Sequence, residues 1–566
     1  MKAIAGRIIY ETLKSYGVPV IFGMEDPIHI FHAVDPKATR IVTIRDEKHG
    51  AIMAHGYAQV TGKVGVCAAT FGPGTSNLAT GLYEAHRSSV PVIALVQDHP
   101  LRVRQRNANS ELDHARAMAP FVKDVLRIDL PEQAGDKVRA AMRLATSGRP
   151  GPIALLCPTD VIATETEAST HAEAAFMRAP ALRTRAEADG LRRAAELLAA
   201  AKLPLIVAGG GAMISGAFEE VRRLAERFAA PTATTLTGRG LLPDGHPLAL
   251  GPIGNQAGGQ YGRSRIANTI AGEADVVVLL GTKTGQLAYG DWKLFRADAR
   301  IVHLDIDPAE LGRNFPTEVA LAGDVRDSLR ELLAIAEASG LKRADPGNGG
   351  RIASLREEWR ARIADRARSA ATPIRPERLI AEIDRVVDAS TVIVADASYS
   401  TAWALSHIDM RGAQRTIISP RGTGSIGWGF SAAIGAKLGA PERPVISISG
   451  DGGFGYAIAE LETAARHRVA LTVVVLNNST LAYQRHWEQK SVGAYRDCDF
   501  VETDFAAIAR AMGCAGERIT DPEAIAPALA RARAATRPHL LDVVIDPQVA
   551  GPVAGMDGDG EQSESH

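Results

Sequence analysis

Two stretches of the sequence decide the fold: Val445-Ile-Ser-Ile-Ser-Gly450-Asp451-Gly452-Gly453 and Leu471-Thr-Val-Val-Val-Leu-Asn477-Asn478. Each contains a short β-branched run, which is typical of a buried strand, and a helical pattern over residues 456–466 separates them. The order strand, glycine turn, helix, strand is that of a βαβ unit. Because consecutive strands of such a unit usually lie close together, Asp451 and Asn478 are expected at the same edge of one sheet.

The residue types at this edge suit a phosphate and a metal ion. Glycines on both sides of Asp451 let the backbone approach a phosphate, and the N-terminus of the following helix favours an anion. A carboxylate, an amide oxygen and a backbone carbonyl, completed by phosphate oxygens and water, form the octahedral shell that Mg²⁺ prefers. The alternative is a plain Gly-Asp-Gly turn beside an unrelated Asn pair. Such a turn recurs at Gly558-Asp559-Gly560, with no preceding strand and no following Asn pair.

Strand-like runs alternate with helical patterns in three blocks of the chain. The runs are Arg40–Ile44, Val64–Ala69 and Val92–Val96, then Leu205–Ala208, Val276–Leu280 and Ile301–Leu304, and finally Val392–Ala395, Val445–Ser449 and Leu471–Leu476. This alternation predicts an α/β protein with three doubly wound parallel-sheet domains. We place the domains at residues 1–165, 190–340 and 372–550, with linkers near 164–189 and 340–350. Residues 551–566 are polar and are expected to form a disordered tail.

Composition narrows the class of protein. The chain has 566 residues, and 64 Lys and Arg balance 65 Asp and Glu, which argues against a dedicated nucleic-acid or anionic-membrane surface. The longest apolar runs are strand-length, and the N-terminus lacks the apolar segment of a signal peptide. The four cysteines are far apart and form no Cys-x-x-Cys pair, so they are expected to be reduced thiols. A cytoplasmic protein without nucleic-acid or membrane partners is predicted.

The Gly-Asp-Gly to Asn-Asn segment resembles the signature of thiamine diphosphate (ThDP) enzymes. The order of the three blocks is similar to that of the acetolactate synthase, pyruvate oxidase and 2-keto acid decarboxylase superfamily, from about residue 1 to 550. The resemblance implies an N-terminal pyrimidine-binding, a central and a C-terminal diphosphate-binding domain. It also implies that Mg²⁺ is held by Asp451, the Asn478 side chain and the Thr480 carbonyl, and the diphosphate by Gly452, Gly453, Tyr399 and Ser400.

The segment Ile41–Gly50 resembles the family segment that ends in the catalytic glutamate, which makes Glu47 the candidate catalytic acid. ThDP chemistry needs a carboxyl group against N1′ of the aminopyrimidine, and burial would raise the pKa of such a group toward neutrality. The alternative is a first-turn helix glutamate favoured by the helix dipole, with Asp46 as the cap. Matching segments that follow favour the catalytic role. The further cofactor-binding candidates of this domain are Gly23, Gly74 and Asn77.

Arg421–Gly429 resembles the strip beneath the cofactor. The resemblance implies that the Gly424 carbonyl accepts from the 4′-amino group, and that Ser425 and Ile426 contact the cofactor. The Ile426 side chain would hold the bent form, an orientation effect of several kcal/mol. The alternative is a glycine-rich loop ahead of a helix.

Glu47 and Asp451 lie in different blocks of the sequence. In the family the corresponding residues meet across a subunit interface. The resemblance therefore implies a homo-oligomer, with a dimer as the smallest active unit and a tetramer as a common form.

The substrate pocket resembles that of the acetolactate synthase branch only in part. The candidate pocket residues are Asp26, Phe71, Gln97, Glu111 and Trp487. The decarboxylases' histidine pair is not evident, because His114 has no neighbouring histidine in the sequence. Gly281–Gln286 replaces an arginine-rich segment for FAD and substrate, and Phe22–Asp26 replaces a glycine-rich turn. FAD therefore stays open as a cofactor.

The function implied is ThDP- and Mg²⁺-dependent decarboxylation of a 2-oxo acid, with carboligation of the remaining fragment to a second carbonyl compound. The alternative is a 2-oxo acid decarboxylase or C–C lyase that releases an aldehyde without ligation. Product analysis after pyruvate feeding distinguishes the two.

Overall fold

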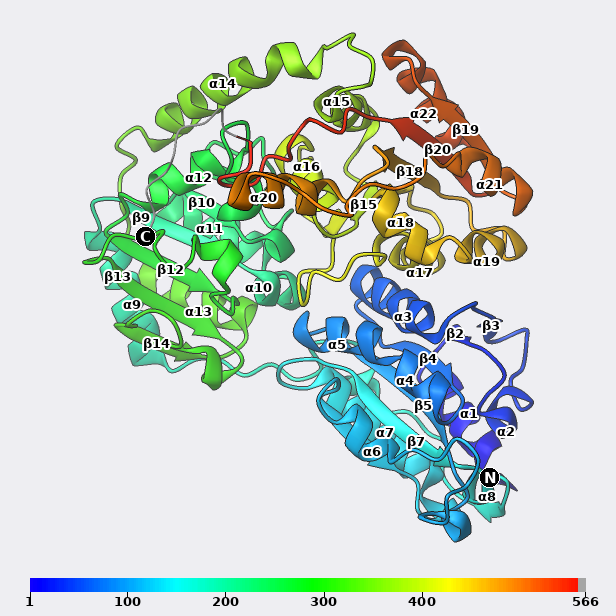
Figure 1. The fold of residues 1–566 in the computed structure, drawn as a ribbon. Coiled ribbons are helices and arrows are strands. Elements are labelled where there is room, and N and C mark those ends of the chain that lie inside the picture. Colours follow the sequence, from blue (N-terminus) through cyan, green and yellow to red (C-terminus); the bar gives the residue numbers. More distant parts are fainter. Residues whose placement is uncertain (558–566) are drawn as a thin grey trace.

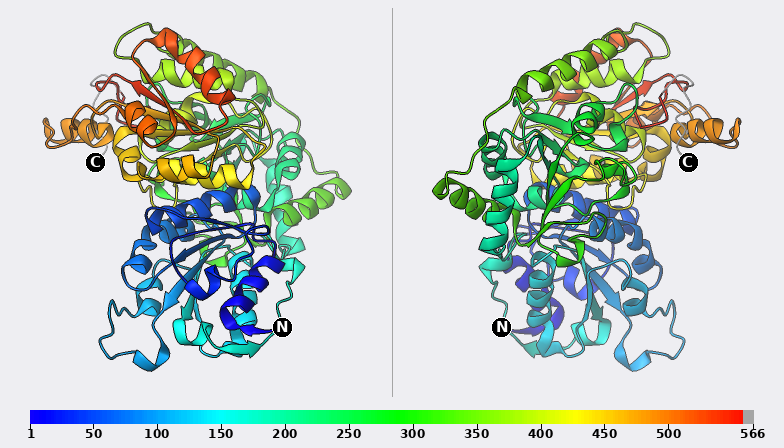
Figure 2. Two further views of the ribbon diagram at one scale, coloured as in Figure 1. Left: turned by 90° about the vertical axis from the view of Figure 1, so that its right-hand side faces the viewer. Right: turned by 90° about the vertical axis from the view of Figure 1, so that its left-hand side faces the viewer.

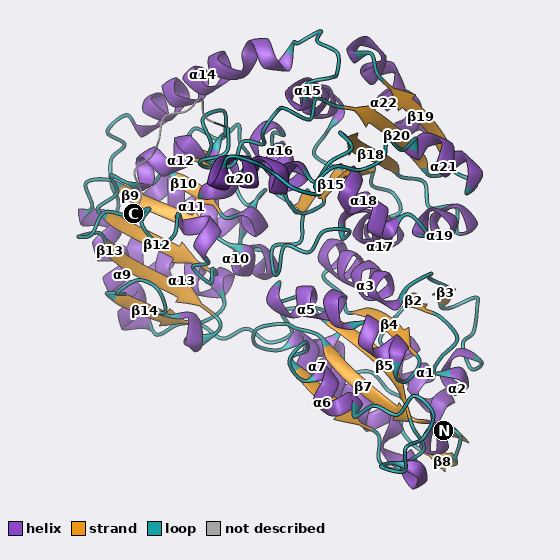
Figure 3. Cartoon of the chain, viewed as in Figure 1, coloured by secondary structure: helices purple, strands orange, loops and turns teal. Residues whose placement is uncertain are grey.

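The structure, a computed structural model, describes residues 1–557 (Figure 1). It contains three six-stranded parallel sheets, with helices packed against them (Figure 3). This confirms the predicted fold class. The sheets span residues 20–158, 204–322 and 392–544, which lie inside the expected domain limits. Gly558-Asp559-Gly560 lies outside the described residues.

The N-terminal sheet has the order β3-β2-β4-β5-β7-β6, with all neighbours parallel. In that order its strands are Arg40–Val42, Val20–Gly23, Gly65–Ala69, Val92–Asp98, Ile153–Pro158 and Asp124–Arg127. Its helices α1 to α8 are Ala5–Ser15, Ile28–Phe31, Glu47–Thr61, Pro73–Asn77, Ala79–Arg87, His114–Met118, Ala134–Thr146 and Thr159–Ile162. A short antiparallel pair, β1 (Lys2–Ile4) and β8 (Glu165–Glu167), closes this domain.

The central sheet has the order β11-β10-β9-β12-β13-β14. In that order its strands are Ala249–Pro252, Thr232–Thr234, Pro204–Ala208, Val276–Leu280, Arg300–Asp305 and Val319–Ala322. Helices α9 to α13 are Ala188–Ala200, Gly210–Ser215, Phe218–Arg227, Ser264–Ala271 and Val325–Ala338. The long helix α14 (Asn348–Ala367) leads to the third domain, so the expected linker over 340–350 ends in the first residues of a helix.

The C-terminal sheet has the order β16-β15-β17-β18-β20-β19. In that order its strands are Ile417–Ile418, Val392–Ala395, Val445–Gly450, Thr472–Asn477, His539–Val544 and Ala515–Ile519. Helices α15 to α22 are Pro376–Val386, Tyr399–His407, Gly429–Gly439, Asp451–Ala457, Glu460–Arg466, Ala482–Val492, Phe505–Ala511 and Ile525–Ala534. The single helix expected over 456–466 is wrong, because α18 begins directly at Asp451 and a break separates it from α19.

The expected disordered tail is also wrong for its first residues. Gly551 packs its backbone on the ring of Tyr399, and Val553 is buried. The Asp557 carboxylate accepts hydrogen bonds from the backbone amides of Gln260 (2.7 Å) and Tyr261 (3.0 Å). Residues 551–557 therefore tie the end of the third domain to the central domain.

The N-terminal and C-terminal domains join through the packing of α3 on α17 (Figure 1). Both helices are rich in small residues, which lets their backbones approach closely. A side chain at Gly56 would collide with the Ala432 carbonyl, and one at Gly435 with the Met53 carbonyl. One apolar core continues through this contact and includes Trp428, which is fully buried.

We expect Gly435→Ala to destabilise the protein by about 1–3 kcal/mol, because the added methyl group has no space between the two backbones. The measurement is the midpoint of thermal or urea unfolding. Gly350→Ala is the matched control, since a methyl group there meets no atom within 4 Å and Ala favours the helix. Equal midpoints for the two variants would contradict the close packing of α3 on α17.

Among the described residues, no helix combines the length and the apolar character needed to cross a membrane.

Candidate functional site

A cavity of about 600 Å³ opens at the carboxyl ends of β15, β17 and β18. Parallel α/β sheets bind ligands at this edge. Nine of the residues singled out from the sequence line it: Tyr399, Ser400, Gly424, Ile426, Asp451, Gly452, Gly453, Asn478 and Thr480. The structure therefore gathers the Gly-Asp-Gly turn, the Asn pair and the glycine strip in one place. Ser425 is not among the lining residues.

Asp451 and Asn478 lie together, as the βαβ pattern predicts. Gly450 pairs with Leu476 in the sheet, and the Asp451 carboxylate accepts from the amides of Gly452 (2.8 Å) and Asn478 (3.2 Å). Burial raises the pKa of Asp451 to about 6, and the backbone amides around it oppose that shift only in part. A buried carboxylate whose donors are neutral amides is a suitable partner for a cation.

The other two expected metal ligands are compatible with this role. Asn478 is half-buried in the wall of the cavity, and Thr480 is buried beside it. The Thr480 carbonyl accepts from the Ala482 amide at 2.9 Å, which leaves its second lone pair. The donor set of carboxylate, amide and carbonyl oxygens fits Mg²⁺ together with a ligand phosphate.

Asp396 is a site residue that the sequence matches to the acetolactate synthase branch, together with Trp403, but to which it assigns no role. It directly follows β15, and its carboxylate accepts from the amides of Ala397 (2.7 Å), Gly427 (3.0 Å) and Trp428 (3.2 Å). Burial raises its pKa to about 6. A side chain at Gly453 would meet the Asp396 carboxylate at 2.6 Å. Asp396 therefore contacts both the Gly427–Trp428 backbone and the start of α18. Its position at a strand end was the available signal.

Glu47 lies in the N-terminal domain and is absent from the lining of this cavity. It begins α3, and the Asp46 side chain caps the helix by accepting from the Lys48 amide at 2.8 Å. Glu47 is only 5% exposed. The Asn77 side chain donates to its Oε2 at 3.0 Å, and a side chain at Gly74 would meet its Oε1 at 2.9 Å. Three of the predicted residues thus form a second group within the first domain.

The remaining N-terminal candidates lie at the carboxyl edge of the first sheet. Gly23 ends β2, and Gln97 is the second-last residue of β5. The backbone amide of Ile28 is shared by Asp26 (3.1 Å) and, more weakly, by the Gln97 side-chain oxygen (3.4 Å). The Phe71 ring packs on His99, with centroids 4.5 Å apart.

Glu111 lies in a loop, and Trp487 lies on an exposed helix. The Glu111 carboxylate accepts from the amides of Gln105 (2.5 Å) and Ala108 (3.0 Å), which fold its loop. Trp487 lies in the third domain on α20, which has no buried residue and projects from the body (Figure 2). Its side chain is 49% exposed. Within one chain, Trp487 and the N-terminal pocket candidates therefore belong to different domains.

His114 has a histidine neighbour in space that the sequence does not reveal. The His99 and His114 rings stack with centroids 5.8 Å apart. The Nε2 atom of His114 accepts from the Gly72 amide at 2.9 Å, so the ring proton lies on Nδ1 and is donated to Asp98 at 2.8 Å. Both nitrogens of His114 are therefore engaged in hydrogen bonds in this structure.

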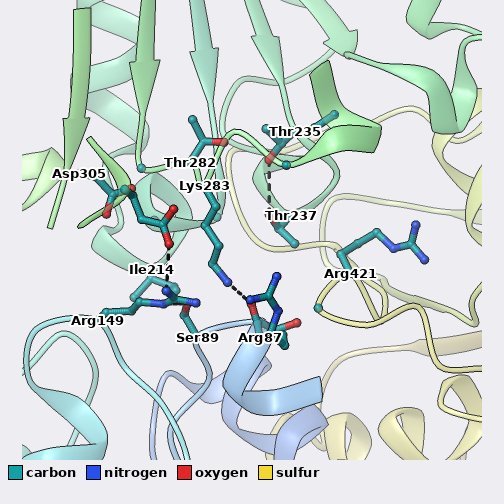
Figure 4. A pocket seen from close by; sticks show the side chains of 18 of the residues that line it. Arg87, Ser89, Arg149, Ile214, Thr235, Thr237, Thr282, Lys283, Asp305 and Arg421 are labelled. Atoms are coloured by element: carbon teal, nitrogen blue, oxygen red, sulfur yellow. Dashed lines mark hydrogen bonds and ion pairs between the residues drawn. The ribbon is translucent and has the colours of Figure 1, made fainter. Parts of the chain in front are cut away.

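A second cavity, of about 740 Å³, is lined by residues of all three domains (Figure 4). Lys283 reaches across it and donates to the Arg87 carbonyl. Burial and the positive charges of Arg149 and Arg87 lower the Lys283 pKa to about 7. Arg149 itself pairs with Glu310 at 3.1 Å. Leu287, Arg421 and Gly424 line both cavities, so the two are neighbours.

Three family models match the chain in the order of its domains. They are described as thiamine pyrophosphate enzyme N-terminal TPP binding domain (residues 4–117), central domain (191–332) and C-terminal TPP binding domain (396–543). The class defined by these matches is that of the thiamine diphosphate enzymes, as the Asp451 cavity indicates.

Curated relatives narrow this class. A probable acetolactate synthase large subunit of Methanocaldococcus jannaschii is 34% identical, over 97% of this chain and 93% of its own length. The probable acetolactate synthase large subunit of Methanococcus aeolicus is 33% identical, over 95% and 92%. An acetolactate synthase of Arthrospira platensis is 32% identical, over 96% and 94%. The chain belongs to the acetolactate synthase-like family of ThDP-dependent enzymes.

Proposed function

We propose that the protein is a ThDP- and Mg²⁺-dependent carboligase that decarboxylates a 2-oxo acid and joins the remaining fragment to a second carbonyl compound. The observation that carries the proposal is the cavity in which the buried Asp451 carboxylate accepts from the amides of Gly452 and Asn478. The printed names of the relatives, acetolactate synthase, support the ligation step.

We assign the residues around the cavity to three parts of the bound ligands: the metal ion, the diphosphate and the pyrimidine. Asp451, Asn478 and the Thr480 carbonyl hold Mg²⁺. Gly452 and Gly453, at the start of α18, and Tyr399 and Ser400, at the start of α16, bind the diphosphate. Gly424, Ser425 and Ile426 support the pyrimidine. When bound, ThDP supplies the means to stabilise negative charge on the carbon that loses carbon dioxide.

Glu47 is the proposed catalytic acid. Asn77 orients its carboxylate through Oε2, which leaves Oε1 to hold or exchange a proton. Because Glu47 is absent from the lining of the Asp451 cavity of its own chain, we propose that it serves a second copy. A homodimer is then the minimum active unit, and a tetramer of two such dimers is compatible with it.

The proposed substrate pocket combines groups of two chains. Asp26, Phe71, Gln97 and Glu111 would come from one copy and Trp487 from the other, because they lie in different domains. Trp487 is exposed, and α20, the helix that carries it, projects from the body of the chain (Figure 2). We infer that a neighbouring chain contacts Trp487.

The test is product analysis with ThDP, Mg²⁺ and pyruvate, followed by a panel of other 2-oxo acids. Release of carbon dioxide with formation of acetolactate supports the proposal. Acetaldehyde without acetolactate would support the alternative, a 2-oxo acid decarboxylase or C–C lyase. No carbon dioxide from any 2-oxo acid would refute both.

We also propose the interdomain cavity as a nucleotide site, with FAD as the candidate ligand. The Lys283, Arg87 and Arg149 charges repel one another there, and a diphosphate would relieve this repulsion. Because such binding favours the charged ammonium, the affinity for FAD should rise about tenfold as the pH falls from about 8 to about 6.

Flavin absorbance of the purified protein and titration with FAD at both pH values measure this prediction. Lys283→Met should weaken FAD binding and remove its pH dependence, whereas Lys293→Met, a lysine outside the cavity lining, should change neither. A pH-independent affinity in the unmodified protein would contradict the role of Lys283.

The cytoplasm is the proposed compartment. Cys67, Cys157, Cys498 and Cys514 are buried free thiols, a state that a reducing compartment preserves.

A further inference from the structure

Residues Arg421–Ile426, the first part of the glycine-rich segment Arg421–Gly429 and from here on called the strip, form a wall that the two cavities share. Arg421 and Gly424 line both of them. Gly422 and Thr423 line only the interdomain cavity, and Ile426 lines only the Asp451 cavity. Whatever fixes the strip therefore also fixes the surface that the proposed cofactor meets.

Glu84 of the N-terminal domain holds one end of the strip. It lies on α5 and is fully buried. One carboxylate oxygen accepts from the Gly422 amide, and the other accepts from both the amide and the hydroxyl of Thr423, each at 2.6 Å. Hydrogen bonds to an ionised carboxylate are among the strong ones.

The backbone at Gly422 also packs closely against α5. A side chain at Gly422 would meet the Arg87 Cβ at 2.6 Å and the Glu84 carboxylate at 2.8 Å. The strip therefore lies directly on α5, at a position that only glycine allows. The hydrogen bonds of Glu84 reach the strip from another domain and span 338 and 339 positions of sequence. Gln256 of the central domain also contacts the strip, by accepting from the Arg421 side chain at 3.2 Å.

The far end of the strip is held within the C-terminal domain. Asp396 accepts from the Gly427 and Trp428 amides, directly after Ile426. Burial lowers the pKa of Arg421, and the negative charges of Glu84 and Asp396 oppose this shift. The strip is thus bound by a buried carboxylate at each end, with Gly424 and Ile426 between them.

We propose that Glu84 is a positioning residue that fixes the strip and thereby sets the affinity for ThDP. The inference rests on the proposed function in one respect, that Gly424 and Ile426 contact the cofactor. Glu84 acts through the backbone and does not touch the cofactor itself. The N-terminal domain then has two tasks: its Glu47 serves the partner chain, and its Glu84 shapes the cofactor site of its own chain.

Thr423→Val is the most selective test, because Thr423 is exposed and the change removes a single donor to Glu84. We expect ThDP binding, measured by calorimetry with Mg²⁺, to weaken about tenfold, the effect of losing one hydrogen bond to a charged group. Hydrogen exchange of residues 419–428 in the cofactor-free protein should become faster. Thr423→Ser should restore both, and Glu84→Gln, with one acceptor oxygen in place of two, should weaken binding further.

Thr269→Val is the matched control, since Thr269 is another exposed threonine whose hydroxyl donates only to the Arg265 carbonyl. It should leave exchange in the strip and ThDP affinity unchanged. Unchanged exchange in Thr423→Val, or faster exchange with unchanged ThDP affinity, would overturn the proposal. If the unmodified protein does not bind ThDP at all, the proposed function fails, while the exchange rate still decides whether Glu84 holds the strip.

Discussion

Equal amounts of Glu47→Gln and Asp451→Asn subunits, mixed and allowed to reassort, should recover about a quarter of the unmodified activity, although neither variant is active alone. In a mixed dimer one site carries both changes and the other carries neither. Half of the dimers are mixed, so one site in four is intact. The measurement is carbon dioxide release from the substrate that the panel identifies, before and after subunit exchange.

The expectation follows from the separation of the two residue groups. Glu47 contacts Asn77 and Gly74 of its own domain, whereas the cavity that contains Asp451 has no lining residue from the N-terminal domain. Glu47→Gln alone should lower carbon dioxide release by about 100- to 10,000-fold, because the amide cannot exchange a proton. It should still bind ThDP, since the metal and diphosphate ligands are untouched.

Two outcomes would decide against this arrangement. Failure to recover activity, with subunit exchange verified by differently tagged chains, would place both residues in one chain. High activity of the Glu47→Gln variant alone would remove Glu47 from the chemistry. A mixture of Glu47→Gln with the Glu47→Gln/Asp451→Asn double variant is the control, because no dimer in it has an intact site.

The features that the sequence predicted are those that neighbouring residues determine. The run Val276–Leu280 is five consecutive apolar residues, and it forms β12 with the same limits. The sequence predicts that Asp451 and Asn478 lie together, because a βαβ unit has one handedness and puts both strand ends at one edge. The Asp46 cap of α3 follows from the residue type alone.

The features that were missed depend on contacts between distant segments. Nothing in the residues around Glu84 indicates that its partners are Gly422 and Thr423. The polar composition of the tail predicts disorder, yet Asp557 is fixed by two amides of the central domain. Composition reports the average tendency of a segment, whereas one buried carboxylate with suitable donors can determine its position.

The contact between His99 and His114 is likewise not predictable from the residues around either histidine. His114 and His99 are 15 positions apart and stack because the chain returns to place His114, the first residue of α6, beside Asp98 at the end of β5. The hydrogen bond from Gly72 fixes the tautomer of His114, and that bond exists only in the folded chain.

Asp451→Asn should abolish the stabilisation of the protein by Mg²⁺ and ThDP. At about 100 times Kd, the ligands should stabilise the unmodified protein by about 2.7 kcal/mol, seen as a raised thermal midpoint. The variant has a neutral amide where the metal needs a carboxylate, so its midpoint should not respond. Glu47→Gln is the control and should keep the full response.

Without Mg²⁺ and ThDP, we expect Asp451→Asn to be at least as stable as the unmodified protein. Burial raises the folded-state pKa of Asp451 to about 6, above the usual value near 3.8. The folded state therefore holds a proton that the unfolded state has released between these values, and its stability falls as the pH rises through that window. At pH 7 and without ligands, Asp451→Asn should therefore unfold at the same temperature as the unmodified protein or higher. A variant that unfolds much earlier would show that Asp451 serves the fold through its amide partners. A variant that still responds to Mg²⁺ and ThDP would exclude Asp451 as a metal ligand.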